Sequence, residues 1–348
     1  MTIKVLVVDD SALIRSLLST IIKAEKDMVL IGSAPDAYVA RDLVNRYAPD
    51  VITLDIEMPK VDGLTFLEKL MKAHPTPVVM ISTLTEQGAG ATIRALELGA
   101  IDYIAKPKLD VAQGIEEYRQ LILEKIRTAA VAKVKTVTPR INNENLVLHY
   151  SGTEKIIAVG ASTGGTEAIK EFLMQLPANS PAVVITQHMP PGFTTSFAKR
   201  LNELCKIKVC EAKGGERILP GNAYLAPGNF HLSIERSGAD YRTRLLDTPR
   251  VSGHKPSVDV MFASLAKCAA QNTLAVIMTG MGRDGAQGMY LLHEKGAFTL
   301  AQDEATCVVF GMPKEAINLG GINKTLPLTQ LAPAVIQKLQ TLKAGSRL

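Results

Sequence analysis

Four apolar segments near the start of the chain each end in polar residues. The segments and the residues that follow them are 3–8 with Asp9 and Asp10, 51–54 with Asp55, 77–82 with Thr83, and 100–105 with Lys106. Because ligands bind at the carboxyl ends of the strands in an open parallel sheet, we expect these side chains to lie together. Three neighbouring carboxylates repel one another unless a divalent cation lies between them, and oxygen ligands of this kind suit Mg²⁺. The pattern therefore predicts a metal site of Asp9, Asp10 and Asp55. An added phosphoryl group beside it would contact Lys106 and Thr83.

Strand-like and helix-like patterns alternate through this part of the chain. Strands are expected near 3–8, 28–33, 50–54, 77–82 and 100–104, and helices near 11–25, 36–47, 63–73, 86–98 and 111–128. Regular alternation of this kind is typical of a doubly wound α/β fold with a parallel sheet.

Residues 1 to about 120 resemble a response-regulator receiver domain, whose fold is flavodoxin-like. The resemblance rests on Asp9, Asp10, Asp55, Met58-Pro59, Asp62-Gly63, Thr83, Tyr103 and Lys106-Pro107. It implies that Asp55 accepts a phosphoryl group from a histidine kinase, with Mg²⁺ held by Asp10 and Asp55. It also implies that Thr83, Tyr103 and Lys106 form the switch around that group. The alternative, in which the acidic pair only caps the next helix, is disfavoured by the joint spacing of the other residues.

The length of 348 residues predicts two domains. We expect a receiver domain at 1–125, a linker at 126–152 without a sustained apolar period, and a second domain at 153–348. The first domain carries an excess of acidic side chains and the second an excess of basic ones. No recognition-helix pattern accompanies the basic half and aromatic residues are only 5% of the chain, so no nucleic-acid partner is expected.

No apolar run approaches the roughly 20 residues that cross a bilayer. The chain begins directly with a strand-like segment and not with a signal peptide, so we expect a cytoplasmic protein without membrane insertion. The four cysteines, Cys205, Cys210, Cys268 and Cys307, show no CxxC spacing, which disfavours a zinc site or a redox motif.

The alternation resumes after Lys155. Buried strands are expected at 156–159, 182–186, 274–278 and 297–301, with a helix near 285–294. The turn residues Pro227-Gly228-Asn229 predict an antiparallel hairpin between 222–226 and 231–234, to which 241–246 would add a third strand. The second domain is therefore predicted to be α/β, with a mainly parallel sheet and an antiparallel hairpin.

Three loops in this second half follow apolar strands and carry reactive side chains. Ser162 lies in a G-x-S-x-G sequence, His188 closes a strand, and Asp284 lies among glycines. Each has a plainer alternative: a tight or phosphate-binding turn for Ser162, a structural role for His188, and a helix N-cap for Asp284. Together they supply a nucleophile, a base and an orienting carboxylate. Their order, Ser then His then Asp, differs from the α/β-hydrolases and from the common serine proteases.

These loops resemble the catalytic domain of the chemotaxis protein-glutamate methylesterases, the CheB family. Leu225-Ala226-Pro227-Gly228 and the segment 254–259 also match, and the likeness spans both domains. The resemblance implies a triad of Ser162, His188 and Asp284, with the backbone N–H of Met281 in the oxyanion hole and no cofactor for hydrolysis. It implies a phosphorylation-activated enzyme that removes methyl esters from glutamates, and deamidates glutamines, on chemoreceptors (the methyl-accepting chemotaxis proteins). The phosphodonor would be the chemotaxis histidine kinase.

Two alternatives stay open. A response regulator with a binding output, such as a transcription factor, has only the basic second half in its favour. A two-domain regulator whose esterase acts on a different target fits the same residues, because substrate choice depends on surface shape.

Overall fold

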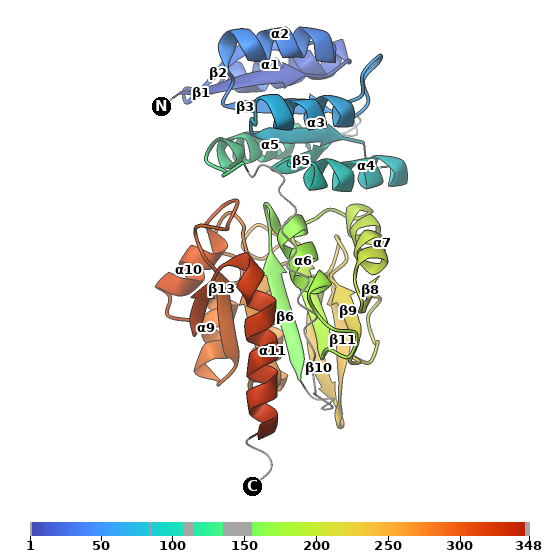
Figure 1. The fold of residues 1–348 in the computed structure, drawn as a ribbon, viewed down its shortest axis with the longest axis vertical. Helices are drawn as coiled ribbons and strands as arrows, with labels where there is room; N and C mark the ends of the chain where they lie inside the picture. Colours follow the sequence, from blue (N-terminus) through green and yellow to red (C-terminus); the bar gives the residue numbers. More distant parts are fainter. Residues whose placement is uncertain (1, 84, 107–113, 135–154, 345–348) are drawn as a thin grey trace. The chain divides into compact units, whose positions relative to one another are not determined.

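The computed structural model describes residues 2–83, 85–106, 114–134 and 155–344. The chain divides into two compact units, Met1–Pro139 and Arg140–Leu348 (Figure 1). The last helix of the first unit continues to Ala130 and so occupies the start of the expected linker. Most of the remaining linker lies outside the described residues, and its extent stays a prediction.

The first unit is a five-stranded parallel sheet in the order β2-β1-β3-β4-β5, which is the flavodoxin-like order. Its strands are β1 (Ile3–Val8), β2 (Met28–Ala34), β3 (Val51–Asp55), β4 (Val78–Ser82) and β5 (Asp102–Ala105). Its helices are α1 (Ala12–Lys23), α2 (Ala37–Tyr47), α3 (Gly63–Ala73), α4 (Glu86–Glu97) and α5 (Gly114–Ala130). The predicted receiver fold is confirmed.

Local sequence explains these elements. All residues of β3 and β4 are buried, as expected for central parallel strands covered on both faces. Helix α1 begins after Ser11, whose side chain accepts a hydrogen bond from the N–H of Ile14. The buried residues of α1 recur at helical spacing and form its inner face: Ile14, Leu18, Ile21 and Ile22.

The second unit contains a seven-stranded, wholly parallel sheet in the order β14-β13-β12-β6-β7-β9-β8. Its strands are β6 (Ile156–Ala161), β7 (Ala182–Gln187), β8 (Lys208–Glu211), β9 (Asn222–Leu225), β12 (Thr273–Ile277), β13 (Phe298–Gln302) and β14 (Lys324–Leu326). Its helices are α6 (Gly165–Met174), α7 (Phe193–Leu204), α8 (Val258–Cys268), α9 (Ala286–Glu294), α10 (Met312–Asn318) and α11 (Leu328–Ala344), with a short 3₁₀ helix at Ala270–Asn272.

A separate antiparallel hairpin joins β10 (His231–Ser237) to β11 (Asp240–Leu246). The predicted pairing of 222–226 with 231–234 is wrong, because β9 pairs in parallel with β7 and β8. The hairpin turn lies instead between Ser237 and Asp240, where Gly238 adopts a φ of 62°. A positive φ at the first residue of a two-residue connection is what a tight hairpin needs.

Strand order places a topological switch point in each sheet. In the first unit β1 lies beside β3, and the chain leaves them toward opposite edges. In the second unit β6 lies beside β12, with Gly160 opposite Ile277, and again the chain leaves toward opposite edges. Ligands in open α/β sheets bind at the carboxyl ends of strands at such points. Both clusters of candidate site residues lie there.

None of the helices within the described residues is both long enough and apolar enough to cross a membrane. The four cysteines are free thiols, and burial raises the pKa of the Cys205 thiol to about 12.

Candidate active site and phosphoacceptor site

Ser162 lies on the sharp turn that joins β6 to α6. Gly164 makes the turn possible, because its φ of 76° is a conformation that other residues rarely adopt. The N–H of Ser162 donates to the carbonyl of Thr279 at 3.0 Å, and the Gln187 amide donates to the carbonyl of Ser162 at 2.9 Å. The nucleophile loop is therefore fastened to the ends of both neighbouring strands, β12 and β7.

His188 follows β7 and connects the other two predicted triad residues. Its Nδ1 lies 3.1 Å from the Oγ of Ser162, and its Nε2 lies 2.7 Å from the Oδ2 of Asp284. An ionised carboxylate only accepts hydrogen bonds, so Nε2 must carry the hydrogen in the neutral ring. Nδ1 is then left with its lone pair facing Ser162, which is the arrangement a general base needs.

Asp284 is 1% exposed and accepts a dense set of hydrogen bonds. The donors other than His188 belong to the start of α8: the hydroxyl of Ser257 at 2.7 Å, and the backbone N–H groups of Val258 at 2.7 Å and Asp259 at 3.1 Å. Burial alone would raise the pKa of Asp284, but the hydrogen bond and charge of His188, with the hydrogen bonds from Ser257 and Val258, lower it. Asp284 is therefore held as an anion.

The helix-cap alternative for Asp284 does not describe its contacts. The N-cap of the helix that follows, α9, is Gly285, which has no side-chain cap. Asp284 instead binds the N-terminus of a different helix, α8, where the helix dipole favours negative charge.

The support of Asp284 by Ser257 was not predicted from the sequence. Ser257 is the N-cap of α8, and its own N–H donates to Nδ1 of the buried His231 at 3.0 Å. His231 in turn lies 3.0 Å, through Nε2, from the carbonyl of Pro249. The available signal was a serine just before an apolar helical period, which indicates a cap but not the carboxylate that it binds.

Met281, the predicted oxyanion donor, lies on the loop after β12. Its backbone N–H makes no hydrogen bond to another residue that the structure describes. The preceding Gly280 packs directly on the nucleophile: a Cβ built on it would lie 2.8 Å from the Cβ of Ser162. An unused N–H beside the nucleophile fits an oxyanion hole.

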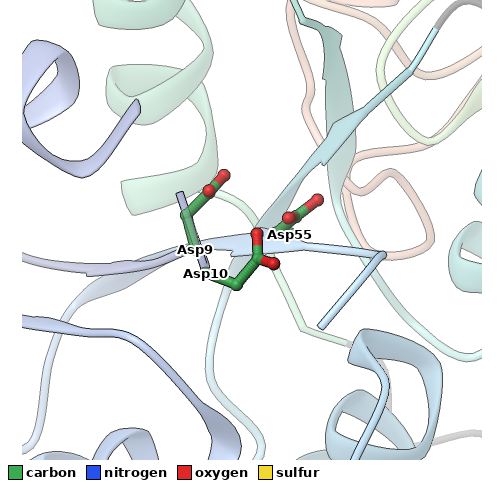
Figure 2. A group of neighbouring side chains, drawn as sticks. All are labelled: Asp9, Asp10 and Asp55. Atoms are coloured by element: carbon green, nitrogen blue, oxygen red, sulfur yellow. The ribbon is translucent and has the colours of Figure 1, made fainter. Parts of the chain in front are cut away.

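The three predicted metal-binding carboxylates gather at the switch point of the first unit. Figure 2 shows Asp9 and Asp10 on the chain that leaves β1, and Asp55 at the end of β3. Each offers an oxygen, and these oxygens lie within 4.8 Å of one another. Asp9 and Asp55 are buried, whereas Asp10 is exposed. The Oδ2 atom of Asp9 is buried without a hydrogen-bond partner among the described residues. A hard divalent cation fits this set of oxygens.

Lys106 partly neutralises the cluster. Its Nζ lies 2.8 Å from the Oδ2 of Asp55 and 3.5 Å from the Oδ2 of Asp9. Burial nevertheless raises the pKa of Asp55 to about 6, and the neighbouring Asp9 adds to the rise. Burial also raises the pKa of Asp9. One lysine does not balance this negative charge, and a cation would.

The other two predicted switch residues, Thr83 and Tyr103, lie at the ends of neighbouring strands or within them. The hydroxyl of Thr83 lies 3.3 Å from the carboxylate of Glu57, two residues after Asp55. Tyr103 lies in β5 and is buried. Pro107, which was part of the resemblance, lies outside the described residues.

Known proteins match both units. The CheB methylesterase family matches residues 157–335, and the response regulator receiver domain family matches residues 5–116. The protein-glutamate methylesterase/protein-glutamine glutaminase 2 of Pseudomonas aeruginosa is 57% identical over 353 residues, with 100% of each chain covered. The protein-glutamate methylesterase/protein-glutamine glutaminase of Salmonella typhimurium is 54% identical, with 97% of each chain covered.

A solved structure supports the same relationship. The crystal structure of the Thermotoga maritima CheB methylesterase catalytic domain is 37% identical, with a TM-score of 0.52, and it covers 53% of this chain and 99% of that one. The chain therefore belongs to the CheB methylesterase family, with a response regulator receiver domain ahead of its methylesterase domain.

Proposed function

We propose that this protein is a protein-glutamate methylesterase and protein-glutamine glutaminase that acts on chemoreceptors in chemotaxis adaptation. We further propose that it works in the cytoplasm and is activated by phosphorylation of its receiver domain. The observation that carries the proposal is the hydrogen-bonded series from Ser162 through His188 to Asp284, with contacts of 3.1 and 2.7 Å. Relatives that match it along the whole chain are named for this activity.

The proposed first step is attack of Ser162 on the γ-carbonyl of a glutamyl methyl ester. The Ser162 proton passes to Nδ1 of His188, and Asp284 stabilises the imidazolium that forms. The N–H of Met281 donates to the developing oxyanion. Collapse of the tetrahedral intermediate breaks the bond to the methoxy group, which leaves as methanol with the proton from Nδ1.

The second step releases the product. Water attacks the acyl carbonyl while Nδ1 of His188 accepts its proton. The bond between the acyl carbon and the Oγ of Ser162 then breaks, Oγ takes the proton back from Nδ1, and the glutamate side chain leaves as the carboxylic acid. For a glutamine side chain, ammonia takes the place of methanol as the leaving group. These steps need only water and the residues of this site.

The receiver domain supplies the control. Asp55 is the proposed phosphoacceptor, and a chemotaxis histidine kinase is the proposed phosphodonor. Asp9, Asp10 and Asp55 would hold Mg²⁺, which neutralises the charge of the carboxylates and of the phosphoryl oxygens. Lys106, already 2.8 Å from Asp55, would then pair with the phosphoryl group.

Methyl release tests the proposal directly. Receptors carrying radiolabelled methyl esters are mixed with the full-length protein, with and without Mg²⁺ and acetyl phosphate as phosphodonor. We expect volatile methanol from the wild type, more of it with the phosphodonor, and none from Ser162→Ala. Hydrolysis of a small activated ester without release from receptors would indicate a different target. No hydrolysis of either substrate would refute the esterase assignment.

A further inference from the structure

A second histidine covers the catalytic one. The rings of His254 and His188 are stacked, with centroids 3.7 Å apart and an angle of 12° between their planes. Both nitrogens of His188 are already engaged, by Ser162 and by Asp284, and its side chain is 7% exposed. The stacked ring therefore occupies a face of the imidazole that the hydrogen bonds leave uncovered.

The local backbone fixes the position of His254. It closes a tight turn with Val251, in which the N–H of each residue donates to the carbonyl of the other, at 2.9 and 3.0 Å. The two central residues, Ser252 and Gly253, have φ values of 53° and 82°. Positive φ at both central positions is typical of a type I′ turn, which needs no support from the side chain of His254.

The same segment continues into the support of the triad acid. Three residues after His254, Ser257 donates to the Oδ1 of Asp284 at 2.7 Å. The short stretch from the turn to the start of α8 thus reaches His188 in two ways. It holds the ring through Asp284, in the plane of the imidazole, and through His254, from above that plane.

We propose that His254 is a positioning residue for His188. It keeps the imidazole in the orientation that directs Nδ1 to Ser162 and Nε2 to Asp284. Rotation of a histidine ring about its outer side-chain bond has a broad energy profile, so hydrogen bonds alone do not restrain it fully. His254 acts through His188, because the nitrogen that faces the Oγ of Ser162 belongs to His188.

The inference rests on the triad mechanism proposed above, and two substrates separate their tests. Full-length wild-type protein and variants are assayed with methylated receptors and with p-nitrophenyl acetate, a small activated ester. If the wild-type enzyme released no methanol from receptors, the proposed substrate would be refuted. The role of His254 would then be tested with p-nitrophenyl acetate alone. The variants are His254→Ala, His254→Gln and His254→Phe, with His293→Ala on α9 as the control.

We expect His254→Ala and His254→Gln to lower kcat about tenfold with little change in KM, because stacked aromatic pairs are worth an energy of that order. His254→Phe keeps an aromatic face and should recover most of the rate. His293→Ala should match the wild type. A wild-type kcat in His254→Ala or in His254→Gln would overturn the proposal. A His254→Phe variant that is folded but as slow as His254→Ala would also overturn it, because stacking would then not be the cause.

Discussion

The Nε2 atom of His188 lies 2.7 Å from the Oδ2 of Asp284, so the acid binds the ring nitrogen that leaves Nδ1 facing Ser162. Asp284 is itself held by three donors from the start of α8. The position of its carboxylate is therefore set by contacts that do not involve His188. The direction of proton transfer in this site is therefore set by the position of a helix N-terminus.

Nucleophile and base are expected to act as one unit. Ser162→Ala removes the attacking oxygen, and His188→Ala removes the group that takes its proton. Because either loss stops the same step, the double variant should be no slower than the slower single variant. Methyl release from receptors at saturating phosphodonor measures this. A double variant much slower than both singles would contradict a shared step.

Asp284→Asn should lower kcat steeply while KM changes little. The amide keeps the shape but loses the charge that stabilises the imidazolium, and an equivalent loss in another triad costs about 10⁴ in rate. Glu294→Gln, on the exposed surface of α9, is the matched control and should keep the wild-type rate. Near-normal turnover by Asp284→Asn would mean that Asp284 only binds the N-terminus of α8 and has no part in catalysis.

Gly280→Ala tests the oxyanion loop. The added Cβ would lie 2.3 Å from the Sδ of Met312, 2.8 Å from the Cβ of Ser162 and 3.1 Å from its N. The Met312 side chain must therefore move, and so must Ser162 or the loop before Met281. Loss of one oxyanion donor costs about 10² to 10³ in kcat, and we expect a loss near the lower figure. Gly90→Ala in α4, where a Cβ meets nothing within 4 Å, should leave the rate unchanged. Equal rates for the two variants would argue against Met281 as donor.

Phosphorylation should depend on Asp55 and on Mg²⁺. Incorporation of phosphate from acetyl phosphate is expected to vanish in Asp55→Asn and in wild type treated with a chelator. Asp42→Asn, which changes an exposed carboxylate paired with Arg41, should behave as the wild type.

Because burial raises the pKa of Asp55 to about 6, the affinity for Mg²⁺, which binds the ionised form, should fall as the pH drops through 6. Phosphorylation of Asp55→Asn at the wild-type level would refute the assignment of Asp55 as the phosphoacceptor.

Asp259 gives a stability test with a defined sign. Burial raises its pKa from 3.8 to about 6, and the Asp284 carboxylate adds to the rise. A carboxyl group with a higher pKa in the folded state binds more protons when folded, so stability is lost as the pH rises between those values. Asp259→Asn stays neutral and keeps the oxygen that accepts from the N–H of Gly288.

The Asp259→Asn protein should therefore unfold at a higher temperature than the wild type at pH 8, and the difference should shrink toward pH 4. Thermal unfolding followed by circular dichroism across this range measures it. Glu294→Gln serves again as the control, with a difference that does not grow with pH. An Asp259→Asn advantage that is the same at pH 4 and pH 8 would exclude ionisation of Asp259 as its cause.

The sequence by itself determined the fold class of both units and the edge of each sheet that carries a site. Apolar segments predicted the strands, and Asp9, Asp55, Ser162 and His188 each stand at or just beyond the end of one of them. Where a residue lies relative to the end of its own strand depends on neighbouring residues only, so the local sequence predicts it. The resemblance to known families then related these residues to their expected roles.

Only the tertiary structure decided which segments became neighbours. Asp284 reaches His188 because β12 and β7 lie on the two sides of β6, although β7 and β12 are far apart in the chain. The predicted partner of 222–226 was wrong, because β9 pairs with β7 and β8. Every strand presents the same backbone donors and acceptors, so local periodicity identifies a buried strand without naming its partner.

The support around the triad was equally invisible in the sequence. Ser257 carried the signal of a helix cap, and His254 carried no signal for a ring stacked on His188. Both contacts depend on where the start of α8 lies against the loops after β7 and β12. The position of α8 is set by packing across the whole core and not by the residues adjacent to Ser257 and His254 in the chain. Through these two contacts the position of α8 orients His188, the base that acts on Ser162.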